Sequence, residues 1–85
     1  MSLQFRPDVS TADTEYGTVL LDERSGHYWQ LNPTGVLVVR TLLAGGTPTQ
    51  AVIALTEEFD VDKPQAMQDV TGLVEQLRSA GLVTP

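Results

Sequence analysis

The sequence has very few of the side chains that redox and catalytic sites require. It contains no cysteine, which excludes a disulfide framework and thiolate chemistry, and only one histidine in 85 residues. His27 has no cysteine with which to form a Cys–His pair, and no serine with an orienting acid with which to form a Ser–His–Asp triad. We therefore expect no catalytic residue and a protein that is not an enzyme.

Positive charge is scarce as well. Eleven acidic residues outnumber five basic ones, which gives a net charge of −6. The basic residues are scattered singly along the chain, at Arg6, Arg24, Arg40, Lys63 and Arg78. A nucleic-acid-binding protein needs a basic surface that neutralises phosphates. The charge therefore disfavours DNA, RNA and anionic membrane surfaces as partners.

Long apolar runs and ligand-binding loops are also missing. No apolar run approaches the roughly 18 residues of a membrane span, and the N-terminus has no signal-peptide pattern, so we expect a cytoplasmic location. The acidic residues around position 60 lack the glycine and the ligand spacing of a calcium loop. Gly45-Gly46 is not followed by the Lys-Ser/Thr pair of a phosphate-binding loop. We expect no metal and no cofactor.

The residues that are present indicate a single small domain, which we place at residues 1–85. Their hydrophobic content of 41% is ordinary for a globular protein. Alternating and β-branched residues predict three strands, at residues 3–6, 16–22 and 27–31, and the polar residues 7–15 predict a loop. The last two strands would form a hairpin around a turn-forming segment.

Three helices are predicted to follow the strands. Their starts are marked by Asn32 with Pro33, by the capping box Thr47-Pro48-Thr49-Gln50, and by Asp62-Lys63-Pro64-Gln65. Gly45 or Gly46 would end the first helix and Gly81 the third. The expected fold is α+β and winged helix-turn-helix-like: a three-stranded antiparallel sheet followed by three helices (βββααα).

The last predicted strand is expected to have a free edge. His27, Trp29 and Leu31 would share one face, with Tyr28 and Gln30 on the other. Because Leu31 leads into the first helix, we expect it in the core and Trp29 further out on the same face. No proline and no charge protects this edge, so it suits an extended peptide that adds as a fourth strand.

The third helix has an apolar stripe that covers an arc of roughly 140°. One side of the stripe holds Ala66, Leu73, Leu77 and Ala80, and the other side holds Met67, Val70, Val74 and the aliphatic stem of Arg78. A helix that faces the core explains such a stripe by itself. The alternative is that one margin faces the core while the other lines a groove beside the last strand.

Two segments, "GTVLLDERSGHYWQLNPTGVLVVRTLLAG" and "DVTGLVEQLRSAGLV", together resemble the PqqD-like family, also called RiPP recognition elements. The resemblance runs from about Leu3 to Val83, and its most specific parts are Leu20–Asn32 and Leu77–Val83. "HYWQLNPTG" and "FRPDV" are most similar to stand-alone members from lasso-peptide gene clusters.

The resemblance implies a non-catalytic protein that binds the N-terminal leader of a ribosomally synthesised precursor, here of the lasso type. The leader would add as a strand to the third strand of the sheet and pack on the third helix. The domain would deliver the precursor to a cysteine-protease-like leader peptidase and an ATP-dependent macrolactam synthetase. Because the sequence ends two residues after Val83, we expect a free-standing protein that recruits its peptidase in trans.

Carried over to this sequence, the resemblance implies ten leader-binding residues. They are His27, Tyr28, Trp29, Gln30 and Leu31 on the strand, and Met67, Asp69, Val70, Val74 and Arg78 on the helix. Main-chain groups of the strand would hold the leader backbone, while Trp29 and the apolar helix residues would form a pocket. Asp69 could face a leader Lys or Arg, and Arg78 or Lys63 a leader carboxylate.

Two other functions remain open. The fold outline also permits a winged-helix DNA-binding or regulatory protein, which the negative charge disfavours and which retention on heparin would support. An adaptor that pairs with itself through the same free strand edge is the second alternative. Light scattering with and without a peptide would separate that adaptor from a peptide-binding protein.

Overall fold

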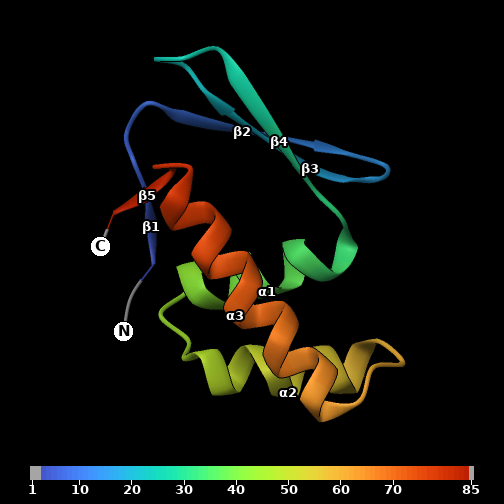
Figure 1. The fold of residues 1–85 in the computed structure, drawn as a ribbon. Helices are drawn as coiled ribbons and strands as arrows, with labels where there is room; N and C mark the ends of the chain where they lie inside the picture. Colours follow the sequence, from blue (N-terminus) through green and yellow to red (C-terminus); the bar gives the residue numbers. More distant parts are fainter. Residues whose placement is uncertain (1–2, 85) are drawn as a thin grey trace.

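An antiparallel sheet lies against a layer of three helices in residues 3–84, the part of the chain that this computed structural model describes (Figure 1). The elements are, in chain order, β1 (Gln4–Phe5), β2 (Val9–Thr14), β3 (Gly17–Asp22), β4 (His27–Leu31), α1 (Pro33–Leu43), α2 (Pro48–Glu58), α3 (Lys63–Ser79) and β5 (Val83–Thr84). β2, β3 and β4 form a meander that the helices follow, so the expected α+β architecture is confirmed.

One strand of this sheet differs from the sequence-based prediction. β2 pairs with β3 from Val9↔Asp22 to Thr14↔Gly17, so the segment that we expected to be a loop is a strand. The residues from 11 to 14 are all exposed, and they therefore lack the burial alternation by which a sequence reveals a strand. The expectation that residues 3–6 supply a strand of the meander is wrong.

The N-terminal strand pairs instead with the other end of the chain. β1 and β5 form a separate antiparallel pair with Phe5 opposite Val83, and the Arg6 amide donates to the Leu82 carbonyl at 3.0 Å. Figure 1 shows these two strands side by side next to the C-terminal end of α3. Leu3, Leu82 and Val83 are buried. The pairing thus joins both ends of the described chain to one core.

The helix starts follow the predicted caps. Asn32 Oδ1 accepts a hydrogen bond from the Gly35 amide at 2.9 Å, and Asp62 Oδ1 accepts one from the Gln65 amide at 2.9 Å. The reciprocal capping box at 47–50 is present ahead of α2. Since Asn32 is the only residue between β4 and α1, its cap also sets how the open strand enters the helical layer.

α1 and α3 end with the glycine motif that the sequence predicts. Gly45 (φ +91°) and Gly81 (φ +72°) adopt the left-handed conformation. After α3, the Gly81 amide donates to the Arg78 carbonyl at 3.0 Å and the Leu82 amide to the Leu77 carbonyl at 3.1 Å. This Schellman pattern turns the chain back, and Leu82 becomes fully buried.

The core lies between the sheet and the helices. Its most completely buried large side chains are Leu20 of β3, Val38 of α1, Leu55 of α2 and Leu82. α3 contributes one face to this core, made of Ala66, Val70, Val74 and Leu77. The centre of the apolar stripe on α3 is therefore used for packing inside the protein.

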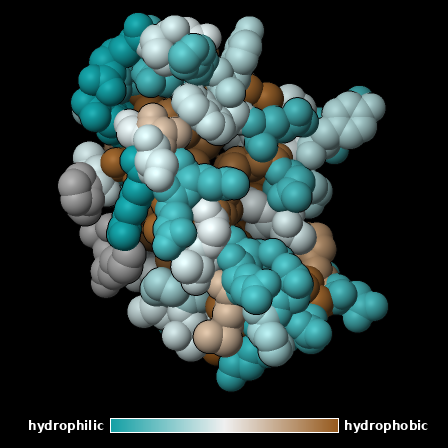
Figure 2. All heavy atoms as spheres, in the orientation of Figure 1, coloured by the Kyte–Doolittle hydropathy of each residue, from teal (hydrophilic) through white to brown (hydrophobic). Residues whose placement is uncertain are grey.

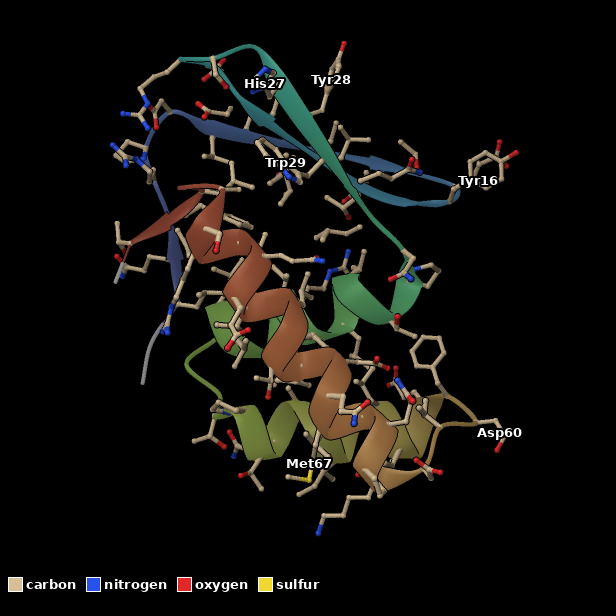
Figure 3. The ribbon with its side chains drawn as sticks, viewed as in Figure 1. Tyr16, His27, Tyr28, Trp29, Asp60 and Met67 are labelled. Carbon is tan, nitrogen blue, oxygen red and sulfur yellow. The ribbon has the colours of Figure 1, made fainter. Side chains whose placement is uncertain are left out.

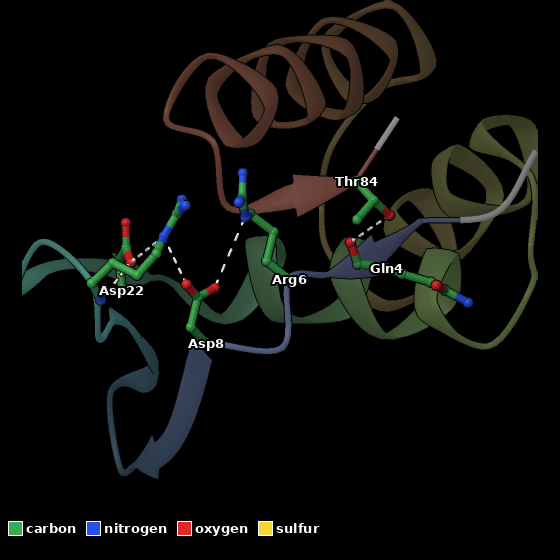
Figure 4. A network of polar contacts seen from close by, with 6 residues as sticks. Gln4, Arg6, Asp8, Asp22 and Thr84 are labelled. Atoms are coloured by element: carbon green, nitrogen blue, oxygen red, sulfur yellow. Dashed lines mark hydrogen bonds and ion pairs between the residues drawn. The ribbon is translucent and has the colours of Figure 1, made fainter.

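A charged cluster holds the β3–β4 hairpin against the start of β2 (Figure 4). Arg24 Nε lies 2.7 Å from Asp8 Oδ2 and 3.9 Å from Asp22 Oδ1, and Arg6 approaches Asp8 Oδ1 at 3.9 Å. Desolvation by itself would raise the pKa of the Asp22 carboxyl. Hydrogen bonds from the Arg24 amide and from Ser25, together with the charge of Arg24, hold this pKa below its ordinary value of 3.8.

Candidate functional site

β4 is an open edge of the sheet in the described part of the chain. The strand order is β2-β3-β4, and β4 pairs with β3 from Asp22↔His27 to Thr18↔Leu31. Its sequence, HYWQL, contains no proline, lysine or acidic residue that would discourage pairing with a further strand. The outer edge of β4 therefore offers main-chain groups to an incoming extended chain.

The side chains of β4 alternate as the sequence predicts. Leu31 is buried, and Trp29 is half-buried against the core. The His27 and Trp29 rings meet edge to face on this side, with ring centroids 6.2 Å apart. Tyr28 lies on the other side and is 72% exposed. Figure 3 shows Trp29 directed toward α3 and Tyr28 directed away from the helices.

A groove runs between β4 and α3. A hollow of about 440 Å³ lies between the end of β4, the start of α1 and the middle of α3, and a wider hollow of about 740 Å³ lies between Trp29 and the second half of α3. Gly72 and Gln76 line both hollows. We call the two together the β4–α3 groove. It is lined by Ala80, just after α3, and on α3 itself by Gln68, Asp69, Gly72, Leu73, Glu75, Gln76 and Ser79.

The floor of the groove is apolar and its rim is polar. Leu31, Val38 and Leu55 contribute to the floor from three different elements, and Leu73 adds a half-buried side chain from α3. Figure 2 shows hydrophobic side chains between the sheet and α3 on this face, with hydrophilic side chains around them. Such an arrangement can bury apolar side chains of a peptide while its backbone pairs with a strand.

The charges in the groove are negative. Its lining includes Asp69 and Glu75, but no lysine or arginine. Asp69 Oδ1 accepts a hydrogen bond from Gln65 Nε2 at 2.9 Å, which orients this carboxylate on the surface of α3. The groove therefore favours a peptide with a positive charge near the middle of α3.

The structure places the predicted helix residues differently from our expectation. Val70 and Val74 are 2% and 8% exposed and belong to the core, and neither is among the residues that line the β4–α3 groove. Met67 is 52% exposed but lines a separate hollow between α2 and α3, and Figure 3 shows it beside α2. Arg78 is exposed and lines none of these hollows. Of the five predicted helix residues, Asp69 lies in the groove.

The placement differs from the expected one because the apolar stripe on α3 is two-sided. Its centre, around Val70 and Val74, packs inside the protein, and its margin at Met67 faces α2. The margin that faces β4 is the opposite one, at Leu73. Gly72 was not among the predicted site residues, but it is the signal in the sequence for this margin, because a glycine in the middle of a helix needs a reason.

Neither a metal site nor a membrane-spanning helix is found among residues 3–84. No three His, Asp or Glu side chains come together there as a metal ion would require. None of the helices in that range combines the length and the apolar character needed to cross a bilayer.

The molecule is thus a small α+β domain with an open strand edge beside a groove, and its relatives share this fold. The family model "Coenzyme PQQ synthesis protein D (PqqD)" matches residues 17–83. The chain belongs to the PqqD family, which is the family of PqqD-like RiPP recognition elements that its sequence resembles.

Two solved structures resemble the whole fold. One, described as "Lasso peptide synthetase B1 complexed with the leader peptide", is 44% identical with a TM-score of 0.92, and the match covers 100% of both chains. The other, described as "TbiB1 in Complex with the TbiA(beta) Leader Peptide", is 26% identical with a TM-score of 0.81 and covers 94% of this chain and 93% of that one. Among curated proteins no match was found.

Proposed function

We propose that this chain binds the leader peptide of a ribosomally synthesised precursor, of the lasso type, as an added strand on β4. The observation that carries the proposal is the open β4 edge beside the β4–α3 groove. It is supported by two related structures that are both complexes with a leader peptide. Main-chain pairing supplies affinity in this mode, and side-chain pockets supply selectivity.

The proposed contacts follow the groove. Main-chain groups of β4 hold the leader backbone, with Trp29 on the sheet side and Leu73 on the helix side of an apolar pocket. Both side chains are half-buried, so each has apolar surface left to cover. Asp69 on the rim is the proposed partner of a leader Lys or Arg. This pocket replaces the expected one at Met67, Val70 and Val74.

In this proposal, leader binding brings the precursor to the enzymes that process it. The chain would carry the precursor to a cysteine-protease-like leader peptidase and then to an ATP-dependent macrolactam synthetase, as the family resemblance implies. The test is the rate at which the purified peptidase cleaves the precursor. We expect this rate to rise when the chain is added and to stay at its basal value when Trp29→Ala is added instead.

The binding itself is tested by a fluorescence titration. Trp29 is the only tryptophan, and its half-buried position beside the groove makes its emission sensitive to a bound strand. The probes are the leader of the precursor encoded beside this chain and the leader found in the 44% identical complex. A saturable shift at low micromolar concentration or below is expected. No binding of either probe by calorimetry, together with retention on heparin, would overturn the proposal in favour of a nucleic-acid-binding protein.

A further inference from the structure

Gly72 occupies a position in α3 where the protein itself has no need of a glycine. It lies within the helix, and it is not among the described glycines with positive φ. A Cβ placed on it would meet no heavy atom within 4 Å apart from its chain neighbours and the adjoining backbone of its own helix. Gly46 is different, because a Cβ there would lie 2.7 Å from the Thr41 carbonyl oxygen. Neither backbone conformation nor internal packing accounts for Gly72.

A glycine in a helix interior is also unfavourable for the free protein. Glycine is among the weakest helix formers, because it loses more backbone freedom on folding than any other residue. Gly72 therefore lowers the stability of α3 without a compensating contact inside the described chain. A benefit to a bound ligand would offset this cost.

The position of Gly72 indicates what that compensation is. It is one of two residues that line both hollows of the β4–α3 groove, so it lies at the centre of the groove on its helical side. Trp29 lines one of these hollows and Leu73 the other. A missing side chain at this point exposes the backbone of α3 to whatever occupies the groove.

We infer that Gly72 is a specificity-determining residue, which lets a bulky apolar side chain of the bound leader pack directly against the backbone of α3. The inference rests on the proposed function. A leader strand on β4 directs alternate side chains toward α3, and the one opposite Gly72 lies between Trp29 and Leu73. Any side chain at position 72 would fill this space and push the leader away from the helix.

The test is Gly72→Ala, with Thr71→Ala as the matched control. Thr71 is the neighbouring exposed residue, but it lines the hollow between α2 and α3, outside the β4–α3 groove. Both substitutions improve helix propensity, so both should raise Tm, for Gly72→Ala by roughly 2–8 °C. Only Gly72→Ala should weaken binding of the leader from the 44% identical complex, by at least about tenfold.

A double-mutant cycle identifies the leader side chain that packs against Gly72. Each bulky apolar residue of that leader is changed to alanine and titrated against the wild-type chain and Gly72→Ala. One leader position should lose most of its effect in the Gly72→Ala chain, since the two changes remove the same contact. If Gly72→Ala binds the leader with the same affinity as the wild-type chain, or if the Tm of Gly72→Ala falls, this inference alone is overturned. Failure of the wild-type chain to bind either leader overturns the proposed function and this inference with it.

Discussion

The Leu31 carbonyl occupies the space in which a Cβ on Gly17 would lie. Gly17 opens β3 with φ +142°, and Leu31 is the last residue of β4. This contact between two backbones fixes the end of the open strand at the point where Asn32 caps α1. The geometry of the β4–α3 groove thus depends on a glycine that lies outside it.

Gly17→Ala is expected to destabilise the protein by about 2 kcal/mol or more, because alanine disfavours this backbone conformation and its Cβ overlaps the Leu31 carbonyl. The control is Gly26→Ala. Gly26 also has a positive φ, +76°, but nothing lies within 4 Å of an added Cβ, so its cost should be about 1 kcal/mol. Urea denaturation measures both, and equal costs would contradict the backbone contact.

Trp29→Ala should weaken leader binding by more than about 2 kcal/mol, as the loss of a buried aromatic anchor does. The control is Tyr28→Ala, because Tyr28 points away from the groove and is 72% exposed. Circular dichroism should be unchanged in both variants. Calorimetry is the measurement, since Trp29→Ala has no tryptophan left, and equal affinities of the two variants would contradict the proposed pocket.

Val74→Asp should abolish cooperative unfolding, because it places an unpaired charge in the core. Met67→Asp is expected to fold normally, since its side chain is 52% exposed. Thermal unfolding followed by circular dichroism distinguishes the two. If Val74→Asp instead folds and loses only leader binding, Val74 lines the leader-binding pocket, as the sequence predicted.

Asp69→Asn should slow association with a leader that carries Lys or Arg, and should make the association rate less sensitive to salt. The loss in affinity should be below about 1 kcal/mol, because the carboxylate is on an exposed rim. Asp60→Asn is the control, since Asp60 lies in the loop before α3, away from the groove (Figure 3). Stopped-flow fluorescence at two salt concentrations provides the measurement, and identical rates for both variants would contradict a role for Asp69.

Asp22 should contribute stability that depends on pH. Because its pKa in the folded protein lies below the ordinary 3.8, the ionised form stabilises the fold above pH 3.8. This contribution is lost as the pH falls through the lower pKa of the folded state. Asp22→Asn should therefore be less stable than wild type at neutral pH, and the difference should shrink in acid. A difference that stays constant from pH 7 to pH 2.5, measured by urea denaturation, would contradict this role.

Local signals along the chain were sufficient for the helices and for β3 and β4. Asn32, the capping box at 47–50 and Gly81 act within a few residues of themselves, so their effect is the same wherever the helix packs. The alternation in β4 likewise predicted which face Leu31 and Trp29 share. The open strand edge, which is half of the candidate site, was therefore accessible from sequence.

The other half of the site, on α3, was not predicted apart from Asp69. Caps, turns and alternation are local interactions, so the residues alone predicted the order of the helices, their ends, the α+β class and the two faces of β4. Three features appear only in the folded chain: β1 pairs with β5, β2 joins the sheet, and α3 turns Gly72 and Leu73 toward β4. These choices depend on which of several apolar surfaces are buried together, and that is settled by packing the whole chain around one core.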